Sequence, residues 1–225
     1  MNIAIIGTGK IGKGIQALLP KDWKLLLACD AEHPLEKAPK ETLSNIDLFF
    51  EFTEPKASRK NINFICGSKK GTKIVCGTTG WNIAEVKDKV METGALLLHS
   101  ANFSLGINAI NNLVANLSKD LSTKNGFKVS MSEYHHVHKK DSPSGTAKML
   151  VATIESNGQK CPITSFREGE IPGIHIIQFK SEFETVEIKH EVSSRQVFCA
   201  GAIAGAEWLL KQNRPGIYNS NDVIA

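Results

Sequence analysis

The stretch Asn2-Ile3-Ala4-Ile5-Ile6-Gly7-Thr8-Gly9-Lys10-Ile11-Gly12, residues 2–12, decides the class of fold to which this chain belongs. Its first half is a short apolar run of the kind that a buried parallel strand needs. A glycine-rich turn follows directly, and a helical segment then ends near Pro20. A strand, a glycine turn and a helix in this order are typical of the opening of a Rossmann domain, which binds dinucleotides.

Each part of the turn has a physical use in holding a dinucleotide. Gly7 and Gly9 carry no side chain, so the backbone can approach a pyrophosphate closely. Gly12 allows the helix to pack tightly, and the N–H groups at the helix N-terminus attract phosphate charge. The alternative is a Rossmann-like sheet whose turn binds nothing. We favour cofactor binding by the whole turn, which consists of Gly7, Thr8, Gly9, Lys10, Ile11 and Gly12.

An acidic residue at the end of the second expected strand indicates which dinucleotide binds. The apolar run Lys24–Cys29 stops at Asp30, about 20 residues beyond the glycines, where a ribose hydroxyl would lie. A carboxylate there accepts from the 2′-hydroxyl of NADH and repels the 2′-phosphate of NADPH. The expected cofactor is NADH or NADPH, with NADH favoured by Asp30, and the nearby His33 and Lys37 keep NADPH open.

The first hundred residues alternate between strand and helix patterns. Further strands are expected at Ile46–Phe52, Lys73–Cys76 and Ala95–His99, and helices at Lys56–Cys66 and Ile83–Met91. This alternation predicts a parallel, doubly wound sheet. Two turns rich in small polar residues follow the last two strands, at the sheet edge where a cofactor lies, although each by itself could be an ordinary turn. We expect them to line the nicotinamide end through Gly77, Thr78, Thr79, Ala101, Asn102, Phe103 and Ser104.

The pattern changes after Ser104. Residues 106–121 form one amphipathic helical pattern, and the runs 127–133, 174–179 and 184–189 alternate with the period of half-exposed strands. They predict a second domain with antiparallel strands, whose sheet has one face solvated or paired with another subunit. Residues 200–211 predict a final helix that returns to the first domain. The fold class is therefore α/β, with a Rossmann domain of residues 1–105 plus 196–225 and a second α+β domain of residues 106–195.

The most unusual stretch of the chain runs from Glu133 to Thr146. Three imidazoles and two ammonium groups occupy the six positions His135–Lys140, and a helix is expected to begin at Ser144. Imidazoles titrate near neutral pH and lysines are permanent cations, so the stretch combines proton transfer with binding of a carboxylate or phosphate. The N–H groups at the helix start would hold the same anion from another side.

Other interpretations of this stretch are a solvated face, a nucleic-acid patch or a zinc site. Lys139 and Lys140 would repel a metal ion, and no paired Cys or His motif elsewhere in the sequence completes a zinc site, so we expect no metal. The formal net charge of +4 is too small to indicate nucleic acid when the basic residues are spread along the chain. It fits a small anionic substrate.

Composition predicts a cytoplasmic protein. Hydrophobic residues make up 41% and charged residues 22% of the 225 residues, which is ordinary for a soluble globular chain of one or two domains. No apolar stretch is long enough to span a membrane, and the N-terminus lacks the pattern of a signal peptide. The five cysteines form no CxxC pair, so we expect reduced thiols.

These residues resemble a known family, the 4-hydroxy-tetrahydrodipicolinate reductases, also called dihydrodipicolinate reductases, of bacterial lysine and diaminopimelate biosynthesis. The resemblance covers essentially the whole chain. It is most specific at residues 135–147, where a His-His-x-His-Lys run is followed by a Pro-Ser-Gly-Thr-Ala helix start. Further matches are the segments 77–80 and 101–106 and the turn Ser193–Arg195.

The resemblance implies a reaction and a role for each residue of the cluster. The substrate is a small cyclic dicarboxylate, reduced by a hydride at ring C4 and a proton at C3. His135 is the proton donor or acceptor and Lys139 the second acid or a carboxylate partner, while His136, Gly145 and Thr146 hold a carboxylate. The C-terminal segment completes the Rossmann domain, and the middle domain binds substrate and builds a homotetramer. The alternatives are another two-domain NAD(P) oxidoreductase of amino-acid metabolism, such as an aspartate or homoserine dehydrogenase, and a non-catalytic dinucleotide-binding regulator.

Overall fold

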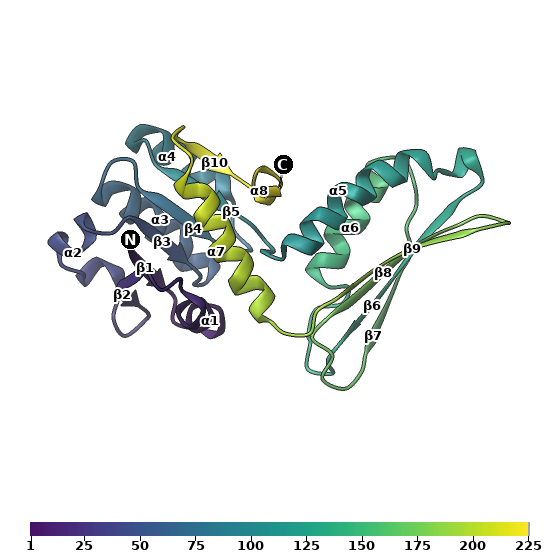
Figure 1. Ribbon diagram of the computed structural model, residues 1–225, viewed down its shortest axis with the longest axis horizontal. Helices are drawn as coiled ribbons and strands as arrows, with labels where there is room; N and C mark the ends of the chain where they lie inside the picture. Colours follow the sequence, from purple (N-terminus) through teal and green to yellow (C-terminus); the bar gives the residue numbers. More distant parts are fainter. Residues whose placement is uncertain (225) are drawn as a thin grey trace. The chain divides into compact units, whose positions relative to one another are not determined.

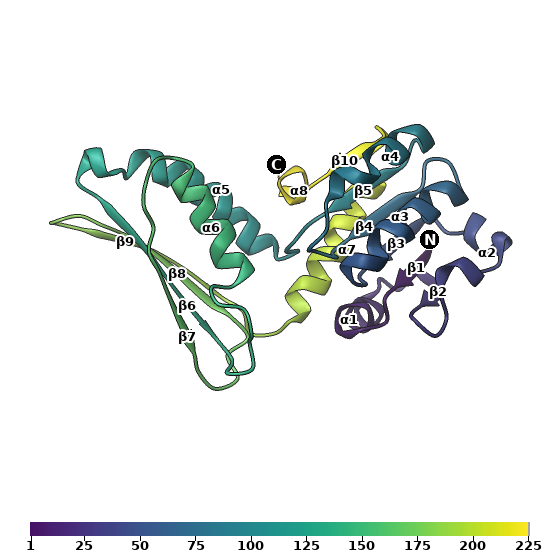
Figure 2. The ribbon, with the colours of Figure 1, turned by 180° about the vertical axis from the view of Figure 1, so that it is seen from behind.

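In the computed structural model, which describes residues 1–224, the chain divides into two compact units. Unit 1 comprises Met1–Ser104 together with the C-terminal segment that begins at Gln196, and unit 2 is the intervening segment Leu105–Arg195. Figures 1 and 2 show each unit from opposite sides. Unit 1 is therefore built from two segments that are distant in sequence, and the units are described separately below.

Unit 1 contains a six-stranded sheet with the strand order β10-β5-β4-β3-β1-β2. Every neighbouring pair is parallel, which confirms the predicted doubly wound sheet. The apolar runs of the inner strands form parallel strands because helices bury them on both faces. The strands are β1 (Asn2–Ile6), β2 (Lys24–Cys29), β3 (Leu48–Glu51), β4 (Lys73–Cys76), β5 (Leu96–His99) and β10 (Gly216–Tyr218).

Successive side chains of β3 show how the two faces of this sheet are covered. Phe49 belongs to a buried cluster with Ile62 of α3, and Phe50 belongs to a second cluster with Ile203 of α7. The C-terminal helix α7 also packs against α1, so it supplies part of the core of unit 1. The helices are α1 (Lys10–Leu18), α2 (Lys40–Ser44), α3 (Pro55–Ser68), α4 (Lys87–Thr93), α7 (Gln196–Leu210) and α8 (Ser220–Ile224).

Two local predictions for unit 1 were inexact, and some short elements were not predicted. The expected helix over residues 83–91 is a 3₁₀ turn, Ile83–Val86, followed by α4, because the Asn82 side chain accepts from Ala84 N and starts the tighter turn. A further 3₁₀ turn spans Leu35–Lys37. The last helix begins at Gln196, four positions before the expected start at residue 200. The edge strand β10 was not predicted, since three residues carry no usable pattern.

Unit 2 is a four-stranded sheet, in the order β7-β6-β8-β9, with both of its long helices on one face (Figures 1 and 2). The predicted antiparallel pairing is found for β6 with β8 and for β8 with β9. Strand β7 was not predicted, and it pairs parallel with β6. The elements are α5 (Leu105–Asp120), a 3₁₀ turn (Thr123–Asn125), β6 (Lys128–His135), α6 (Gly145–Glu155), β7 (Ile163–Arg167), β8 (Ile174–Lys180) and β9 (Thr185–Glu191).

Strand β6 places the functional residues because burial alternates along it. Val129 and Met131 are buried and pack with α5 and α6 in the core of unit 2. Glu133 and His135 follow on the same face, since side chains two positions apart in a strand point the same way. The polar end of β6 is thereby held beside the start of α6. Within residues 1–224, no helix is long and apolar enough to cross a membrane.

Candidate active site

A cleft of about 610 Å³ lies at the carboxyl ends of β1, β2 and β3 in unit 1. Gly7, Thr8, Gly9 and Asp30 all line it, so the structure brings the predicted turn and the predicted ribose partner together. Open α/β sheets bind dinucleotides at this edge. The remaining members of the predicted turn, Lys10, Ile11 and Gly12, form the first residues of α1.

The glycines of the turn are required for different structural reasons. Gly7 has a φ of +100°, and a Cβ there would lie 2.1 Å from the carbonyl oxygen of Phe52. A Cβ at Gly12 would lie 2.0 Å from the carbonyl oxygen of Gly7. Gly7 and Gly12 are therefore needed for the turn to close. Nothing lies within 4 Å of a Cβ built at Gly9, so this residue faces open space, as a turn that receives a pyrophosphate requires.

Asp30 is held as an ionised acceptor. Its Oδ2 accepts from Thr8 Oγ1 at 3.0 Å, and its Oδ1 accepts from the backbone N–H groups of Glu32 and His33 at 3.0 and 2.9 Å. The backbone hydrogen bond from His33, followed by that from the Thr8 hydroxyl, lowers the pKa of Asp30. The carboxylate is thus fixed in the cleft in the form that accepts from a ribose hydroxyl.

The two polar turns after β4 and β5 lie side by side, because these strands are neighbours. Thr78 is buried, accepts from Thr53 N at 2.9 Å and donates to Glu51 Oε2 at 2.8 Å. Ser104 is also buried, with its N–H donating to Asn102 Oδ1 at 2.8 Å. The predicted lining residues Gly77, Thr79, Ala101 and Phe103 lie in the same two turns, where Thr79 and Ala101 are exposed and Phe103 is buried in the core.

Glu51 is a feature of this edge that sequence analysis missed. The side chain is fully buried at the end of β3 and accepts hydrogen bonds from Thr53, from Ser58 Oγ at 2.6 Å and from Thr78. A buried carboxylate needs several donors to offset its loss of water. It therefore ties together the ends of β3 and β4 and the first turns of α3.

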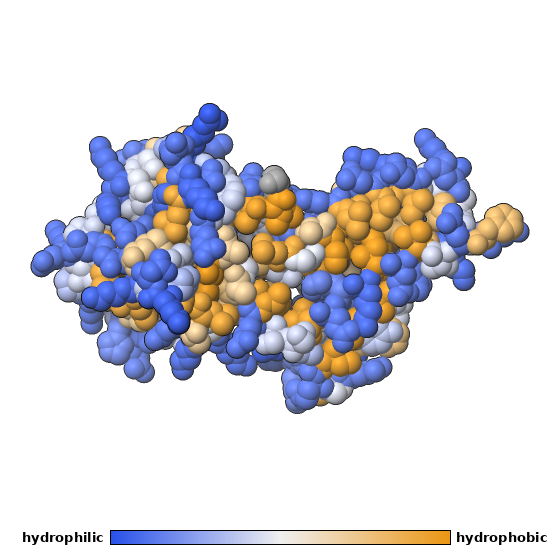
Figure 3. All heavy atoms as spheres, in the orientation of Figure 1, coloured by the Kyte–Doolittle hydropathy of each residue, from blue (hydrophilic) through white to orange (hydrophobic). Residues whose placement is uncertain are grey.

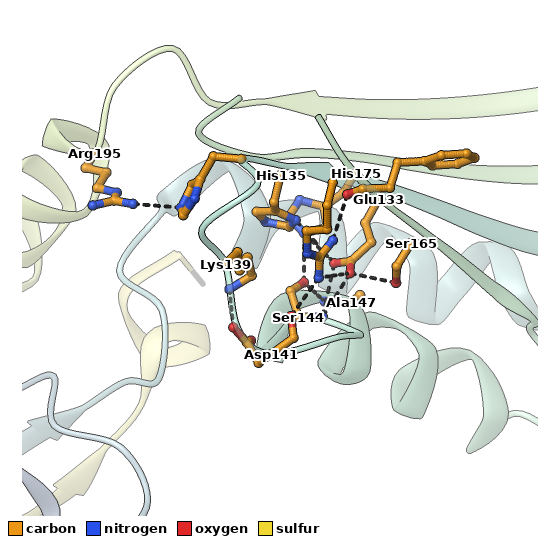
Figure 4. Close-up of polar contacts among 12 residues, drawn as sticks. Glu133, His135, Lys139, Asp141, Ser144, Ala147, Ser165, His175 and Arg195 are labelled. Atoms are coloured by element: carbon orange, nitrogen blue, oxygen red, sulfur yellow. Dashed lines mark hydrogen bonds and ion pairs between the residues drawn. The ribbon is translucent and has the colours of Figure 1, made fainter. Parts of the chain in front are cut away.

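The predicted His and Lys cluster divides into separate contacts in unit 2 (Figure 4). Lys139 Nζ pairs with Asp141 Oδ1 at 2.7 Å. Arg195 Nη2 lies 3.0 Å from His136 Nε2. Because a guanidinium only donates, His136 accepts through Nε2 in this contact. Arg195, which had been noted only as part of a turn, thus brings a positive charge to His136.

The other members of the cluster lie in different surroundings. His138 is largely exposed, and its Nε2 lies 3.5 Å from Glu170 Oε1. Lys140 is exposed to solvent. His135 alone points into unit 2, where the residue is only 6% exposed. Strand β6 ends at His135 and the following residues leave the sheet, so His135 is the member of the cluster that lies in the interior of unit 2.

Glu133 is the centre of the buried part of the site (Figure 4). The Ser144 N–H donates to both carboxylate oxygens at 3.0 and 3.1 Å, and Oε1 also accepts from Ser165 Oγ at 2.8 Å and Arg167 Nη2 at 3.1 Å. Burial alone would raise the pKa of Glu133, but these hydrogen bonds outweigh burial and lower that pKa. Glu133 is therefore an ionised, fully buried carboxylate.

His135 lies between this carboxylate and a second buried histidine. Its Nδ1 is 3.5 Å from Glu133 Oε2, and its ring meets that of His175 edge to face with 5.2 Å between centroids. Burial is the main influence that lowers the pKa of His135, and the charge of Glu133 opposes it. Burial lowers the pKa of His175 to about 4, so His175 is neutral near pH 7. The pair therefore places one titratable imidazole against a neutral one.

Helix α6 begins where the sequence predicted, with Ser144 as its N-cap. The Ser144 side chain accepts from Ala147 N at 3.1 Å, while the Ser144 N–H is taken by Glu133. The predicted anion site at this helix start is therefore partly occupied by the protein's own carboxylate. Gly145 and Thr146 are the first helical residues after the cap, and Gly145 is exposed.

The donor atoms of Glu133, His135 and His175 lie within 4.8 Å of one another, a spacing that a metal ion could bridge. The carboxylate already receives the Arg167 guanidinium at 3.1 Å, and a cation placed beside it would be repelled. The donor set therefore fits a carboxylate–imidazole pair better than a metal centre.

The glycine turn, the acidic residue at the end of β2 and the buried carboxylate–imidazole pair together define a class, the two-unit NAD(P)H-dependent oxidoreductases. Family comparison narrows the class. Residues 1–103 match the N-terminus of dihydrodipicolinate reductase, and residues 106–224 match its C-terminus. The chain belongs to the dihydrodipicolinate reductase family, and the resemblance seen in the sequence is confirmed.

Two relatives agree with this assignment, and a solved structure has a similar fold. The chain is 32% identical to the 4-hydroxy-tetrahydrodipicolinate reductase of Christiangramia forsetii, with 100% of this chain and 98% of the relative covered. It is 34% identical to the enzyme of the same name from Rickettsia rickettsii, with 99% and 98% covered. Its fold is similar to a dipicolinate-bound dihydrodipicolinate reductase from Paenisporosarcina sp. TG-14, with a TM-score of 0.80, 18% identity and 98% of each chain covered.

Several residues of the site were missed at the sequence level. A signal for Glu133 was present, because it lies two positions before His135 in an alternating strand and so shares its face. Arg167 and His175 come from β7 and β8, and no local pattern links them to β6. Only the strand pairing brings them together.

Proposed function

We propose that this protein reduces 4-hydroxy-tetrahydrodipicolinate, or the dihydrodipicolinate formed from it, to tetrahydrodipicolinate in the diaminopimelate route to lysine. The observation that carries the proposal is His135, a buried imidazole paired with Glu133 at the end of β6 and followed by Lys139 beside the start of α6. Bound NADH or NADPH would supply a hydride to ring C4. The protein must then deliver a proton to C3 and stabilise negative charge on the ring.

His135 is the proposed proton donor. Its ring is fixed between Glu133 and His175, so it is already oriented for transfer. Lys139 is the proposed second acid, or the partner of a substrate carboxylate. Its ammonium group is held at 2.7 Å by the half-exposed carboxylate of Asp141, and a substrate carboxylate would take the place of Asp141 as its partner.

The remaining proposed substrate contacts are His136, Gly145 and Thr146. Gly145 and Thr146 lie at the N-terminus of α6, whose dipole favours a carboxylate. Arg195 beside His136 adds the positive charge that a dianion needs.

Binding of pyridine-2,6-dicarboxylate tests these contacts. A Thr146→Val variant should bind this dicarboxylate more weakly. Calorimetry in buffers of different ionisation enthalpy should show proton uptake on binding, since a bound carboxylate raises the pKa of nearby histidines. Full affinity in this variant together with no proton exchange would place the anion site elsewhere.

Unit 1 fits a nicotinamide dinucleotide. The turn Gly7–Gly12 would hold the pyrophosphate, and the residues after β4 and β5 would line the nicotinamide end. We propose NADH as the preferred cofactor, because Asp30 is an ionised acceptor fixed in the cleft. The unpaired, buried cysteines fit a reducing compartment such as the cytoplasm.

The decisive assay follows NADH and NADPH oxidation with the product of dihydrodipicolinate synthase as substrate. His135→Ala and Lys139→Ala should each lower turnover by roughly 10²–10⁴-fold while leaving NADH affinity nearly unchanged. Lys140→Ala is the matched control, because Lys140 is exposed and should be dispensable. Near-normal turnover in both active-site variants would remove these residues from the mechanism, and no oxidation by the unmodified protein would refute the function.

We also propose a homotetramer that forms through the second face of the unit 2 sheet. That face is opposite α5 and α6 and carries half-exposed apolar side chains, including Ile174, Ile176 and the stacked rings of Tyr134 and Phe166. Such a face needs cover from a partner. Figure 3 shows a further apolar area over helix α5, where Leu105 and Leu113 are exposed.

Sedimentation velocity tests this assembly. Ile176→Glu should shift the protein to smaller species, because a charge is placed in the proposed contact. Met91→Glu makes the same kind of change at a 53% exposed residue of unit 1 and should leave the assembly intact. Identical sedimentation of the two variants would remove this face from the interface.

A further inference from the structure

The carboxylate behind His135 has no role in the reaction as proposed so far. Glu133 is fully buried, and its Oε1 is occupied by Ser165 and Arg167. The Ser144 N–H adds a contact to both oxygens. Oε2 is therefore the oxygen that remains for an imidazole, and it lies 3.5 Å from His135 Nδ1. Figure 4 shows the carboxylate held on one side while it faces His135 on the other.

The two ring nitrogens of His135 have different surroundings. Among the residues that the structure describes, Nδ1 is buried without a hydrogen-bond partner, and the charged atom that faces it is Glu133 Oε2. Nε2 points toward Gly173, where a built Cβ would lie 3.2 Å away. Because Gly173 has no side chain, no side chain from that residue covers Nε2. The ring therefore presents Nε2, and not Nδ1, to a ligand.

We propose that Glu133 is a positioning residue that keeps the Nδ1–H of His135 directed at its carboxylate, so that Nε2 delivers the proton. This inference rests on the proposed function. A lone pair on Nδ1 would be repelled by the carboxylate at 3.5 Å, whereas an N–H is attracted. Which nitrogen of a histidine carries the proton is commonly set by the partner of the other nitrogen.

His135 gives up one proton in this step. The imidazolium of His135 carries a proton on each nitrogen. Its Nε2–H bond breaks, and the electron pair of the ring enamine formed by hydride addition makes the new C3–H bond. The ring that remains is the neutral Nδ1–H tautomer, which Glu133 stabilises. Water then returns a proton to Nε2, and the carboxylate stays ionised throughout.

The charged and titratable groups around His135 all affect the equilibrium between its imidazolium and neutral forms. The charges of Glu133 and Asp141 raise the pKa of His135, while burial, Lys139 and Arg167 lower it. From β8, His175 meets the ring of His135, and from β9, His190 meets the ring of His175. Burial lowers the pKa of both, so neither adds a positive charge near pH 7. Glu133 is therefore the buried charge that favours the proton-donating form.

Nuclear magnetic resonance of the ¹⁵N-histidine-labelled protein tests the proposal without relying on activity. Long-range ¹H–¹⁵N spectra, recorded over a pH range with a chelator present, should show neutral His135 as the Nδ1–H tautomer, with the signal assigned from a His135→Gln variant. In Glu133→Gln, the Nε2–H tautomer should gain population and the pKa of His135 should fall. Glu187→Gln, the same change at an exposed carboxylate of β9, should leave the signal unchanged.

Kinetics completes the test. Glu133→Gln should lower kcat by roughly 10²-fold or more, with the KM for NADH little changed, and Glu133→Asp should recover part of the loss. An Nε2–H tautomer in the unmodified protein overturns the proposal even if Glu133→Gln fails to fold. Unchanged kcat and tautomer in a folded Glu133→Gln overturn it as well. If the unmodified protein shows the Nδ1–H tautomer and its dependence on Glu133 but oxidises no NADH, the proposed function fails while the Glu133–His135 coupling stands.

Discussion

Alanine at Gly12 and alanine at Gly9 should separate the folding role of the glycine turn from its binding role. A Cβ at Gly12 would lie 2.0 Å from the carbonyl oxygen of Gly7, far inside van der Waals contact, and a backbone atom cannot rotate away. Overpacking of this kind typically costs about 1–3 kcal/mol or more, and the better helix propensity of alanine returns at most about 1 kcal/mol. We expect Gly12→Ala to be destabilised by about 2 kcal/mol, which for a protein of this size lowers Tm by about 4–8 °C.

Gly9→Ala should behave in the opposite way. Gly9 has an ordinary φ of −72°, and nothing lies within 4 Å of the added Cβ. Its Tm should stay within about 2 °C of the unmodified protein. The methyl group would occupy the space proposed for a pyrophosphate, so NADH affinity measured by fluorescence titration should fall about tenfold or more. A Tm loss in Gly9→Ala equal to that in Gly12→Ala, or full NADH affinity in Gly9→Ala, would refute this account of the turn.

Three further predictions concern stability and cofactor choice. Burial holds the pKa of His175 at about 4 in the folded protein, whereas an unfolded histidine titrates near 6.5. The stabilisation from neutral His175 is therefore present in full above pH 6.5, and the free energy of unfolding should fall by about 3 kcal/mol as the pH falls toward 4. In His175→Gln, urea unfolding at several pH values should show a correspondingly smaller loss, and an unchanged pH profile would contradict the assignment. Lys73 Nζ donates to the carbonyls of Leu210 and Gln212 at 2.6 and 3.0 Å, so Lys73→Met should lower the free energy of unfolding by about 1–2 kcal/mol, whereas no change in urea midpoint would show that these bonds contribute nothing. Asp30→Ala should weaken NADH binding and narrow the gap to NADPH, and an unchanged ratio of the two dissociation constants would show that Asp30 does not select the cofactor.

The strands of unit 1 could be predicted where helices bury both faces. Strands β1, β3, β4 and β5 are short apolar runs because they lie inside a doubly wound sheet, and such runs can be recognised without knowledge of their neighbours. Strands β2, β7, β9 and β10 lie at the edges of their sheets. Strands β2 and β9 could still be predicted, because β2 is an apolar run and β9 alternates, whereas β7 and β10 carry neither pattern clearly. An edge strand pairs on one side only, so its residues have less need of a distinctive pattern, and its formation depends on the partner strand.

The candidate site was predictable only in its local parts. The glycine turn, Asp30 and the helix start at Ser144 are each set by residues close together in the chain. The pair Glu133 and His135 follows from strand alternation. The contacts of Glu133 with Arg167 and of His135 with His175 depend on strands that pair across more than thirty residues, so these contacts could not be foreseen.

The late position of helix α7 in the sequence affects how the chain folds during its synthesis. Its residues, including Cys199, Ala206 and Leu209, complete the buried cluster that covers Ile5, Phe50 and Val75. These apolar strand residues leave the ribosome early, but their cover is separated from them by the whole of Leu105–Arg195. At typical synthesis rates that delay is roughly 5–20 s. During that interval the half-finished sheet exposes an apolar face in the cell, so the nascent chain, more than the finished protein, is the form that needs chaperones.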